Sequence, residues 1–384
     1  MSYIFDMYDV VVVGGNLAGT TAAISATEKG AKVALIEKYN VPHYPPHCGE
    51  GMDNITASFI NFNQIHCKRN TINELIINLA KKEYAIRFKN NVIITFDRYH
   101  LEKELLKKTK QQGTDLFLGN LVKSYNPPHK IILEDSTKIE GKIIIDASGI
   151  NCVIGKIIGL KPKIKPLDIG VCIQSRVKTN INPKKMKAWF HKPYADYGYG
   201  WIFPIDKNHA NIGLGIPGGQ HIDMKKHLKD YIQHEIHSDY EILNSFYSCV
   251  PSAEPLNKIV KDNVLITGDA ARLANSFLGS GIANAIFSGC LAGCISTDFI
   301  KKKINNLELY QEVLRPKINR LTKVYQKRNK IFSDKNFINA YARTFSILSF
   351  GNKLFPNFFH KKIKNALGED VDIIKKYKKT STLF

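Results

Sequence analysis

Two strand–turn–helix motifs, one near each end of the chain, constrain the fold more than any other feature. The first, at residues 8–23, joins an apolar run at 10–13 to a glycine turn and a helix of small residues. The second, at 264–282, has a short apolar strand that ends at Gly268-Asp269, and a turn at 279–281 that opens a long helix. Apolar, β-branched runs of this kind suit buried parallel strands. If both motifs serve one ligand, the lobe that holds them is discontinuous in sequence.

The N-terminal motif has the spacing of a dinucleotide-binding βαβ unit. Gly14 and Gly19 frame its turn, and Glu37 ends the next strand 18 positions after Gly19, where a carboxylate can bind ribose hydroxyls. Asn16 replaces the middle glycine, but asparagine tolerates positive φ, so the turn can persist. In the second motif Asp269 can accept hydrogen bonds from a sugar alcohol, and the glycine turn can approach an anionic group. Together the motifs predict FAD rather than NAD alone.

Composition limits the class of protein. A chain of 384 residues can form two or three lobes, and with 44% hydrophobic residues but no apolar run of about 18, it is expected not to span a bilayer. Its seven cysteines are scattered, which favours a reducing cytoplasm. His43, His47 and His66 flank Cys48, but their spacing does not indicate a metal site.

Positive charge is concentrated at the C-terminus. The formal net charge is +21, and the last 84 residues hold 20 Lys and Arg against 6 Asp and Glu. In this region the basic residues alternate with apolar clusters such as 340–350 and 354–359, a pattern that suits a helix in a lipid headgroup layer. A generally lysine-rich composition is the alternative, and no nucleic-acid recognition motif is present. We therefore expect a peripheral protein on the cytoplasmic, inner face of the cell membrane.

The order of the motifs predicts three regions. A discontinuous FAD-binding domain is expected over 1–75, 96–160 and 262–303. Polar and apolar residues alternate in 170–177 and 209–216, which predicts an antiparallel-sheet domain over 76–95 and 161–261. Residues 304–384 are expected to form a basic helical region.

Three short motifs together resemble the geranylgeranyl reductase family. They are Cys48-Gly-Glu-Gly51, Tyr199-Gly-Trp201-Ile-Phe203-Pro204, and Gly268-Asp-Ala-Ala-Arg272 with its following glycine turn. The closest likeness is to the archaeal digeranylgeranylglycerophospholipid reductases, and it covers about residues 7–300. The resemblance implies an α/β fold with an α+β second lobe, namely a p-hydroxybenzoate-hydroxylase-like, Rossmann-type FAD domain with a substrate sheet. It also implies FAD as cofactor and reduction of isoprenoid double bonds on membrane lipid precursors.

The resemblance also assigns residues. The expected FAD site comprises Gly14, Gly15, Asn16, Ala18, Gly19, Glu37, Lys38, Cys48, Gly49, Arg98, Ala147, Gly149, Gly268, Asp269, Gly279, Ser280, Gly281 and Ile282. Arg98 would reach the FAD phosphates and Asp269 the ribityl chain. The wall of the isoprenoid tunnel would be Tyr199, Trp201, Phe203 and Pro204. Besides Asn16, two residues depart from the family pattern, since Ser276 and Asp196 stand where proline is usual.

The chemistry of alkene reduction requires hydride from the flavin N5 and a proton from a nearby acid. Cys48 is the candidate acid, because thiols carry their proton at neutral pH, and Gly49 and Gly51 would let its loop approach the flavin ring. Glu50 could supply or relay the proton instead. Cys48 could also be a small buried apolar residue, and Tyr199 and Trp201 could be plain core. Ferredoxin, a quinol or NAD(P)H are all open as electron donors, and an aromatic hydroxylase or a non-catalytic lipid-binding electron-transfer flavoprotein are the alternative functions.

Overall fold

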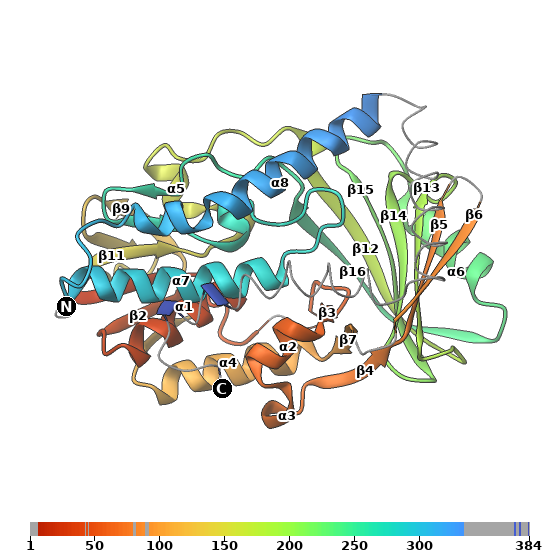
Figure 1. Cartoon of the computed structure of the whole chain (residues 1–384), viewed down its shortest axis with the longest axis horizontal. Coiled ribbons are helices and arrows are strands. Elements are labelled where there is room, and N and C mark those ends of the chain that lie inside the picture. Colours follow the sequence, from red (N-terminus) through yellow and green to blue (C-terminus); the bar gives the residue numbers. More distant parts are fainter. Residues whose placement is uncertain are drawn as a thin grey trace.

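The computed structural model describes residues 7–42, 44, 46–79, 82–88, 92–333, 372–373, 376–377 and 383. Figure 1 shows two lobes side by side, a layered α/β lobe and a large antiparallel sheet, with one long helix running over both. The apolar clusters at 340–350 and 354–359, which the membrane prediction uses together with the basic residues around them, lie outside the described residues.

The first lobe is built on an eight-stranded sheet. Five of its strands are parallel, in the order β18-β11-β1-β2-β8, and β17 adds an antiparallel edge beyond β18. β9 and β10 extend β11 as an antiparallel pair. The bounds are β1 Tyr8–Val13, β2 Val33–Glu37, β8 Asp115–Leu118, β9 Val122–Asn126, β10 Lys130–Leu133, β11 Lys138–Asp146, β17 Val260–Lys261 and β18 Val264–Ile266.

Helices cover this sheet on both sides. α1 and α7 pack against each other on one face together with α4, and β9, β10 and the short α5 close the other face. The bounds are α1 Leu17–Glu28, α4 Arg98–Gln111, α5 Val153–Ile157, α7 Ile282–Ile300 and α8 Leu309–Ser333, with 3₁₀ turns η1 Gly149–Asn151, η2 Pro166–Asp168 and η3 Gly268–Ala271. α7 is long and apolar enough to cross a membrane, but here it is largely buried as a core helix.

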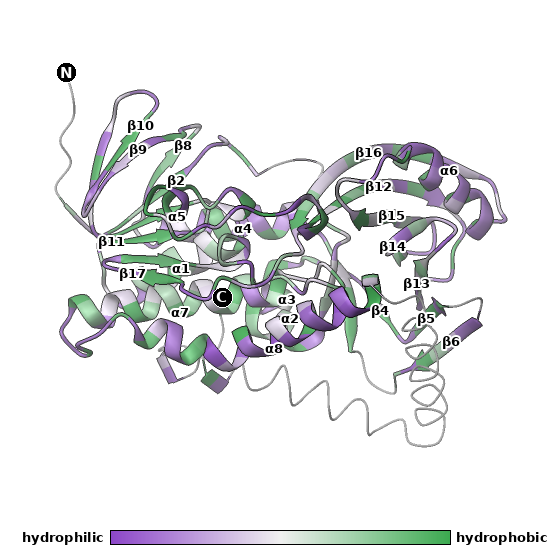
Figure 2. Ribbon diagram, turned by 90° about the horizontal axis from the view of Figure 1, so that it is seen from above, coloured by the Kyte–Doolittle hydropathy of each residue, from purple (hydrophilic) through white to green (hydrophobic). Residues whose placement is uncertain are grey.

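The second lobe is a seven-stranded sheet in the order β16-β12-β15-β14-β13-β5-β6. Its neighbours are antiparallel except for β13 and β5. α6, Met224–Glu235, covers one face with its apolar side and turns a hydrophilic surface outward (Figure 2). The bounds are β5 Glu74–Leu79, β6 Lys82–Arg87, β12 Ile169–Thr179, β13 Lys185–His191, β14 Ala195–Pro204, β15 His209–Pro217 and β16 Tyr240–Pro251.

A small third sheet lies between the lobes and divides the segment 76–95, which we expected to join the large sheet as a whole. β3 Gly51–Asp53, β4 Lys68–Ile72 and β7 Ile93–Phe96 form it in the order β3-β7-β4. β7 therefore departs from the expected domain boundary, because it pairs with strands on either side of α2 Asn54–Ile60 and α3 Phe62–Ile65. The hairpin β5–β6 does join the large sheet, from Glu74 onward.

Candidate functional site

The turn between β1 and α1 is built for close backbone approach. Gly14 has a φ of 109°, and a Cβ on it would lie 2.3 Å from the carbonyl oxygen of Ala147. A Cβ on Gly19 would lie 1.7 Å from the carbonyl oxygen of Gly14. The backbone N–H of Gly15 donates to Glu37 at 2.6 Å, so the carboxylate at the end of β2 holds the turn. Only glycine fits at positions 14 and 19, because a Cβ at either position would collide with the backbone.

Asn16 fills the place of the missing glycine in a way the sequence did not predict. Its φ is −81°, so its tolerance of positive φ is not used, and that part of the reasoning is wrong. The Asn16 side chain instead caps α1, accepting from the N–H of Ala18 at 3.1 Å, and donates to the carbonyl of Ala147 at 2.8 Å. An asparagine cap satisfies one of the free N–H groups at a helix start. Asn16 thereby ties the α1 turn to the end of β11.

Asp269 provides the test of whether these residues fit FAD. Its carboxylate accepts no hydrogen bond from any described residue, and Oδ1 lies 3.1 Å from the place where a Cβ on Gly281 would be. Burial raises the pKa of Asp269, and the nearby Arg98 guanidinium opposes that rise. A half-buried acceptor without a donor, facing a bare glycine turn, suits the hydroxyls of a ribityl chain. The residues present therefore fit the cofactor.

The remaining predicted cofactor residues of the second motif lie between the end of β18 and the start of α7. Gly268 donates its N–H to Ser288 and has a φ of 58°, and Gly279 has a φ of 66°. Asn275 organises the glycine turn, because its N–H donates to the carbonyl of Ser280 at 2.8 Å. α7 then begins at Ile282.

Three more residues that we predicted to bind the cofactor lie elsewhere in the first lobe. Ala18 is buried within α1, where a Cβ on Gly268 would approach its own Cβ to 2.9 Å. Gly149 begins η1 with a φ of 68°. The Lys38 ammonium lies over the Tyr39 ring, 4.6 Å from its centroid.

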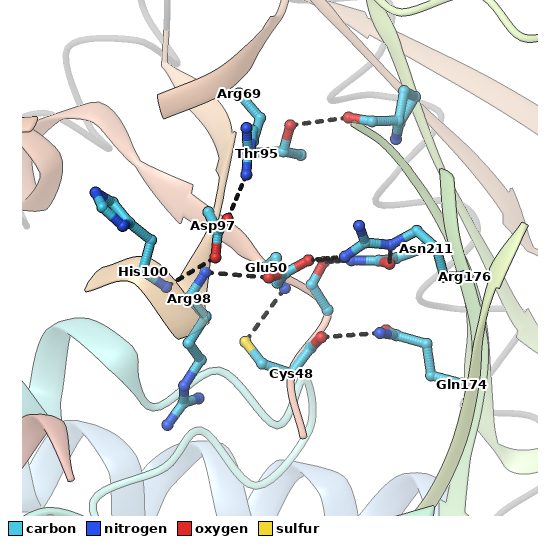
Figure 3. Close-up of polar contacts among 12 residues, drawn as sticks. Cys48, Glu50, Arg69, Thr95, Asp97, Arg98, His100, Gln174, Arg176 and Asn211 are labelled. Carbon is cyan, nitrogen blue, oxygen red and sulfur yellow. Dashed lines mark hydrogen bonds and ion pairs between the residues drawn. The ribbon is translucent and has the colours of Figure 1, made fainter. Parts of the chain in front are cut away.

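Cys48 lies on a loop between the two lobes (Figure 3). Its sulfur accepts a hydrogen bond from the N–H of Glu50 at 3.2 Å. Arg98 donates from Nε to Glu102 at 2.9 Å, and although burial lowers the pKa of its guanidinium, the neighbouring Glu102 and Cys48 raise that pKa more. The structure thus places Arg98 among Cys48, Glu102 and Asp269, and the predicted contact with the FAD phosphates stays a prediction.

Glu50 is the most strongly held residue of this loop. It is 2% exposed and has a φ of 62°, unusual for a residue with a side chain. Its carboxylate accepts from the N–H of Arg98 at 3.0 Å, from Asn211 at 2.9 Å and from Arg176 (Figure 3). Burial raises the pKa of Glu50, and Arg176 opposes that rise. Three donors facing both oxygens is how an ionised carboxylate is bound.

The predicted tunnel residues form an aromatic row on β14. The Tyr199 hydroxyl donates to the carbonyl of Leu278 at 2.6 Å, and its ring stacks on Phe190 with centroids 5.3 Å apart. Trp201 lies next in the row, with its ring centroid 5.5 Å from that of Tyr199. At the end of β14, the carbonyl of Pro204 accepts from Thr95 at 2.8 Å.

Phe203 explains the two glycines of the Cys48 loop. A Cβ on Gly49 would lie 2.9 Å from the Phe203 ring, and a Cβ on Gly51 would lie 3.1 Å from it. We expected these glycines to admit the flavin ring, but the space that they leave is taken by an aromatic side chain of the other lobe. The glycines therefore let the loop pack directly on the seven-stranded sheet.

Sequence reasoning missed the polar residues on the same face of that sheet. Gln174 donates to the carbonyl of Cys48 at 2.9 Å, and Asn211 donates to the carbonyl of Gly49 at 3.1 Å. The alternation of β12 did place Gln174 and Arg176 on one face, but nothing in the sequence shows which face meets the loop. His47 stacks on Phe246 of β16, and among the described residues no group of three metal-ligating side chains comes together.

Comparison with known proteins agrees with this geometry. Residues 9–154 match the family model described as FAD dependent oxidoreductase, and residues 168–250 match the geranylgeranyl reductase catalytic domain. The second match falls on β12 to β16, the strands that face the Cys48 loop. The protein is thus a FAD-dependent oxidoreductase of the type that reduces carbon–carbon double bonds.

Individual relatives and a solved structure are similar to this chain over most of its length. The chain is 26% identical to digeranylgeranylglycerophospholipid reductase 1 of Methanococcoides burtonii, over 80% of this chain and 79% of that one. It is 29% identical to the digeranylgeranylglycerophospholipid reductase of Methanosarcina acetivorans, with the same coverage. A geranylgeranyl bacteriochlorophyll reductase-like structure from Thermoplasma acidophilum superposes with a TM-score of 0.78 at 22% identity, covering 95% of this chain and 99% of that one. The predicted resemblance to the geranylgeranyl reductase family is confirmed, as is the p-hydroxybenzoate-hydroxylase-like fold.

Proposed function

We propose that the protein reduces the double bonds of geranylgeranyl chains on membrane lipid precursors of the archaeal ether type. One observation carries the proposal: the Cys48 loop of the FAD lobe packs directly on the aromatic strand of the sheet lobe through Phe203. In this proposal Cys48 is the proton donor, and it lies where an apolar chain crossing the sheet would meet the cofactor lobe. The relatives named as digeranylgeranylglycerophospholipid reductases support the choice of substrate.

Bound FAD supplies the two-electron reduction of the double bond. The chain's own residues supply the proton that the second alkene carbon needs. We assign this proton to the Cys48 thiol, because the thiolate left behind would face the N–H of Glu50 and the Arg98 guanidinium. Donors already aimed at a developing negative charge lower the barrier to its formation. Glu50 is less suited, since its carboxylate is occupied by three donors.

Apolar contacts carry the binding of the substrate chain in this proposal. Tyr199, Phe190 and Phe277 stack in a continuous row, with the Phe190 and Phe277 centroids 5.7 Å apart. Burial of a hydrocarbon chain stabilises a complex by about 0.8 kcal/mol per CH₂. Such a row can hold an isoprenoid without strong polar contacts.

An anaerobic spectrum tests the reaction. The protein is reduced with dithionite, a geranylgeranyl phospholipid is added, and the oxidised flavin band is followed. Return of the band in the absence of oxygen supports the reductase, whereas a flavin that stays reduced until air enters favours a hydroxylase or an electron carrier. To identify the electron donor, reduced ferredoxin, a quinol or NAD(P)H is added to the oxidised protein without air. The donor is the one that bleaches the flavin band.

The Cys48→Ala variant tests the acid. We expect it to slow lipid reduction about 10²- to 10⁴-fold, the usual contribution of a positioned general acid, while lipid binding persists. Glu50→Gln distinguishes the second candidate only in part, because it also disturbs the loop. Lipid reduction at the wild-type rate in Cys48→Ala would refute the assignment.

We also propose that the protein works at the inner surface of the cell membrane. The net charge of +21 and its concentration near the C-terminus support attraction to anionic lipids. Changing Lys361, Lys362 and Lys364 to Glu should weaken binding to anionic vesicles. The matched control changes three exposed lysines of α6, namely Lys225, Lys226 and Lys229. Equal binding by both triple variants would contradict a membrane role for the C-terminal lysines.

A further inference from the structure

We propose that Gln174 and Trp201 are positioning residues that hold the Cys48 loop at a fixed place on the substrate sheet. Trp201 donates from Nε1 to Gln174 Oε1 at 2.9 Å, and Gln174 donates from Nε2 to the carbonyl of Cys48 at 2.9 Å. We call this chain of two hydrogen bonds the Gln174 bridge. The inference goes beyond the proposed function and rests on it only in taking Cys48 as the proton donor.

The register of the sheet makes the bridge possible. Gln174 on β12 pairs with Gly213 on β15, and Gly213 pairs with Trp201 on β14, so the three stand in one row across the sheet. The indole must therefore cross a whole strand to reach Gln174, a span of about 9–10 Å between backbones. It does so over Gly213, where a Cβ would lie 2.3 Å from Cζ2 of Trp201. A side chain at position 213 would block the crossing.

The indole also fixes which way the Gln174 amide points. Tryptophan Nε1 can only donate, so Gln174 must turn its oxygen to Trp201 and its NH₂ to the loop. Gln174 and Trp201 are 3% and 7% exposed, so water is poorly placed to replace either partner. Without the indole N–H, the amide would be free to flip and present an acceptor to the Cys48 carbonyl, which is itself an acceptor. Trp201 therefore acts on the loop through Gln174, in addition to any contact with a substrate chain.

The neighbouring row of the sheet, which contains Arg176 and Asn211, holds the loop in the same way. Arg176 on β12 pairs with Asn211 on β15, and Arg176 Nε donates to Asn211 Oδ1 at 2.7 Å. A guanidinium can only donate, so Asn211, which is 1% exposed, must turn its NH₂ to the carbonyl of Gly49. Two consecutive loop carbonyls are thus held by two amides, each oriented by a side chain that has no acceptor. Together the two amides fix the distance of the loop from the sheet and the direction in which the loop runs.

Two substitutions break the bridge at different places. Gln174→Met keeps the length of the side chain but removes both hydrogen bonds, and Trp201→Phe keeps an aromatic ring but removes the donor. Trp189→Phe is the matched control, because the chain has two tryptophans and the second also makes an indole hydrogen bond, to Lys192 at 3.3 Å. Trp189 packs against the α6 side of the same sheet, away from the loop.

The readout is alkylation of single cysteines in the FAD-loaded protein, resolved by peptide mass spectrometry. Cys249, which is exposed on β16, serves as the internal reference. Loss of one buried hydrogen bond should raise the population of displaced loop, and with it the alkylation rate of Cys48, about two- to tenfold. We expect this in Gln174→Met and in Trp201→Phe, with no change in Trp189→Phe. Turnover should fall by a similar factor in both bridge variants, with KM changed little in Gln174→Met.

An unchanged alkylation rate at Cys48 in both bridge variants would overturn the proposal, whatever happens to turnover. Flavin absorbance and the melting temperature show whether each variant is folded. If Gln174→Met does not fold, Gln174→Glu takes its place, since it keeps the acceptor for Trp201 but puts an acceptor opposite the Cys48 carbonyl. Faster alkylation in the bridge variants together with active Cys48→Ala would keep the bridge and refute only the proton assignment.

Discussion

Replacing Glu50 with Gln exchanges one carboxylate oxygen for an NH₂ group at the point where the lobes meet. In the wild type Oε1 accepts from the N–H of Arg98, and Oε2 accepts from Arg176 and Asn211. The new amide keeps its oxygen toward Arg176 and Asn211. Its NH₂ group then faces the N–H of Arg98 at the start of α4. A buried N–H left without an acceptor costs about 1–3 kcal/mol, and the lost attraction of Arg176, which is partly exposed, adds about 1 kcal/mol. We expect a loss of about 2–4 kcal/mol in the free energy of unfolding.

Urea unfolding at pH 7, followed by flavin fluorescence and circular dichroism, measures this loss. Glu74→Gln is the matched control, because Glu74 also pairs with two cations, Arg87 and Lys185, but both of these are largely exposed. Exposed pairs of this kind contribute less than about 1 kcal/mol. A Glu50→Gln variant no less stable than Glu74→Gln would refute the reasoning, since it would mean that the buried network adds nothing beyond a surface pair.

Three further predictions concern other carboxylates. Asp269→Asn should raise the Kd for FAD about tenfold in fluorescence titration of the apoprotein, because a charged acceptor binds hydroxyl donors more strongly than an amide. Arg87 lowers the pKa of Glu74, so its stabilisation is present above the ordinary glutamate pKa and is lost as pH falls through the lower folded value. The stability difference between wild type and Glu74→Gln should therefore shrink between pH 7 and about 3. Arg328 is 3% exposed and pairs with Asp168 at 2.5 Å, so Arg328→Met should lower the unfolding free energy by about 3 kcal/mol in urea titrations.

Much of the first lobe could be predicted because its signals are local. The apolar run at 10–13 became the central strand β1, and the helix of small residues expected after it became α1. Glycine spacing predicted the turn because the turn has no room for side chains, as at Gly14. The division of the segment 76–95 between two sheets could not be read in the same way. Both parts contain an isoleucine-rich apolar run, and only long-range pairing of β7 with β3 and β4 decides where β7 belongs.

The contacts of the candidate site were harder to predict for the same reason. Cys48 and Glu50 stood out as a motif, but the partners that hold them come from positions 126 and 161 residues further along the chain. Glutamine and asparagine on strands are common, and their role depends on the face that they occupy. Asn16 shows the opposite error, since a local rule about φ was applied where a helix cap decides the conformation.

The sheet lobe carries the match to the reductase catalytic domain, although the cofactor residues lie in the other lobe. The Cys48 loop gives a physical reason. Its chain leaves the FAD lobe after β2, but its carbonyls at Cys48 and Gly49 and its two glycines are held by β12, β14 and β15. The position of Cys48, the proton donor that we propose, therefore follows the sheet, and so would an apolar chain lying along the aromatic row. A substitution that shifts these strands moves donor and substrate together relative to the cofactor, so it should change the rate of reduction even where it leaves binding of the lipid intact.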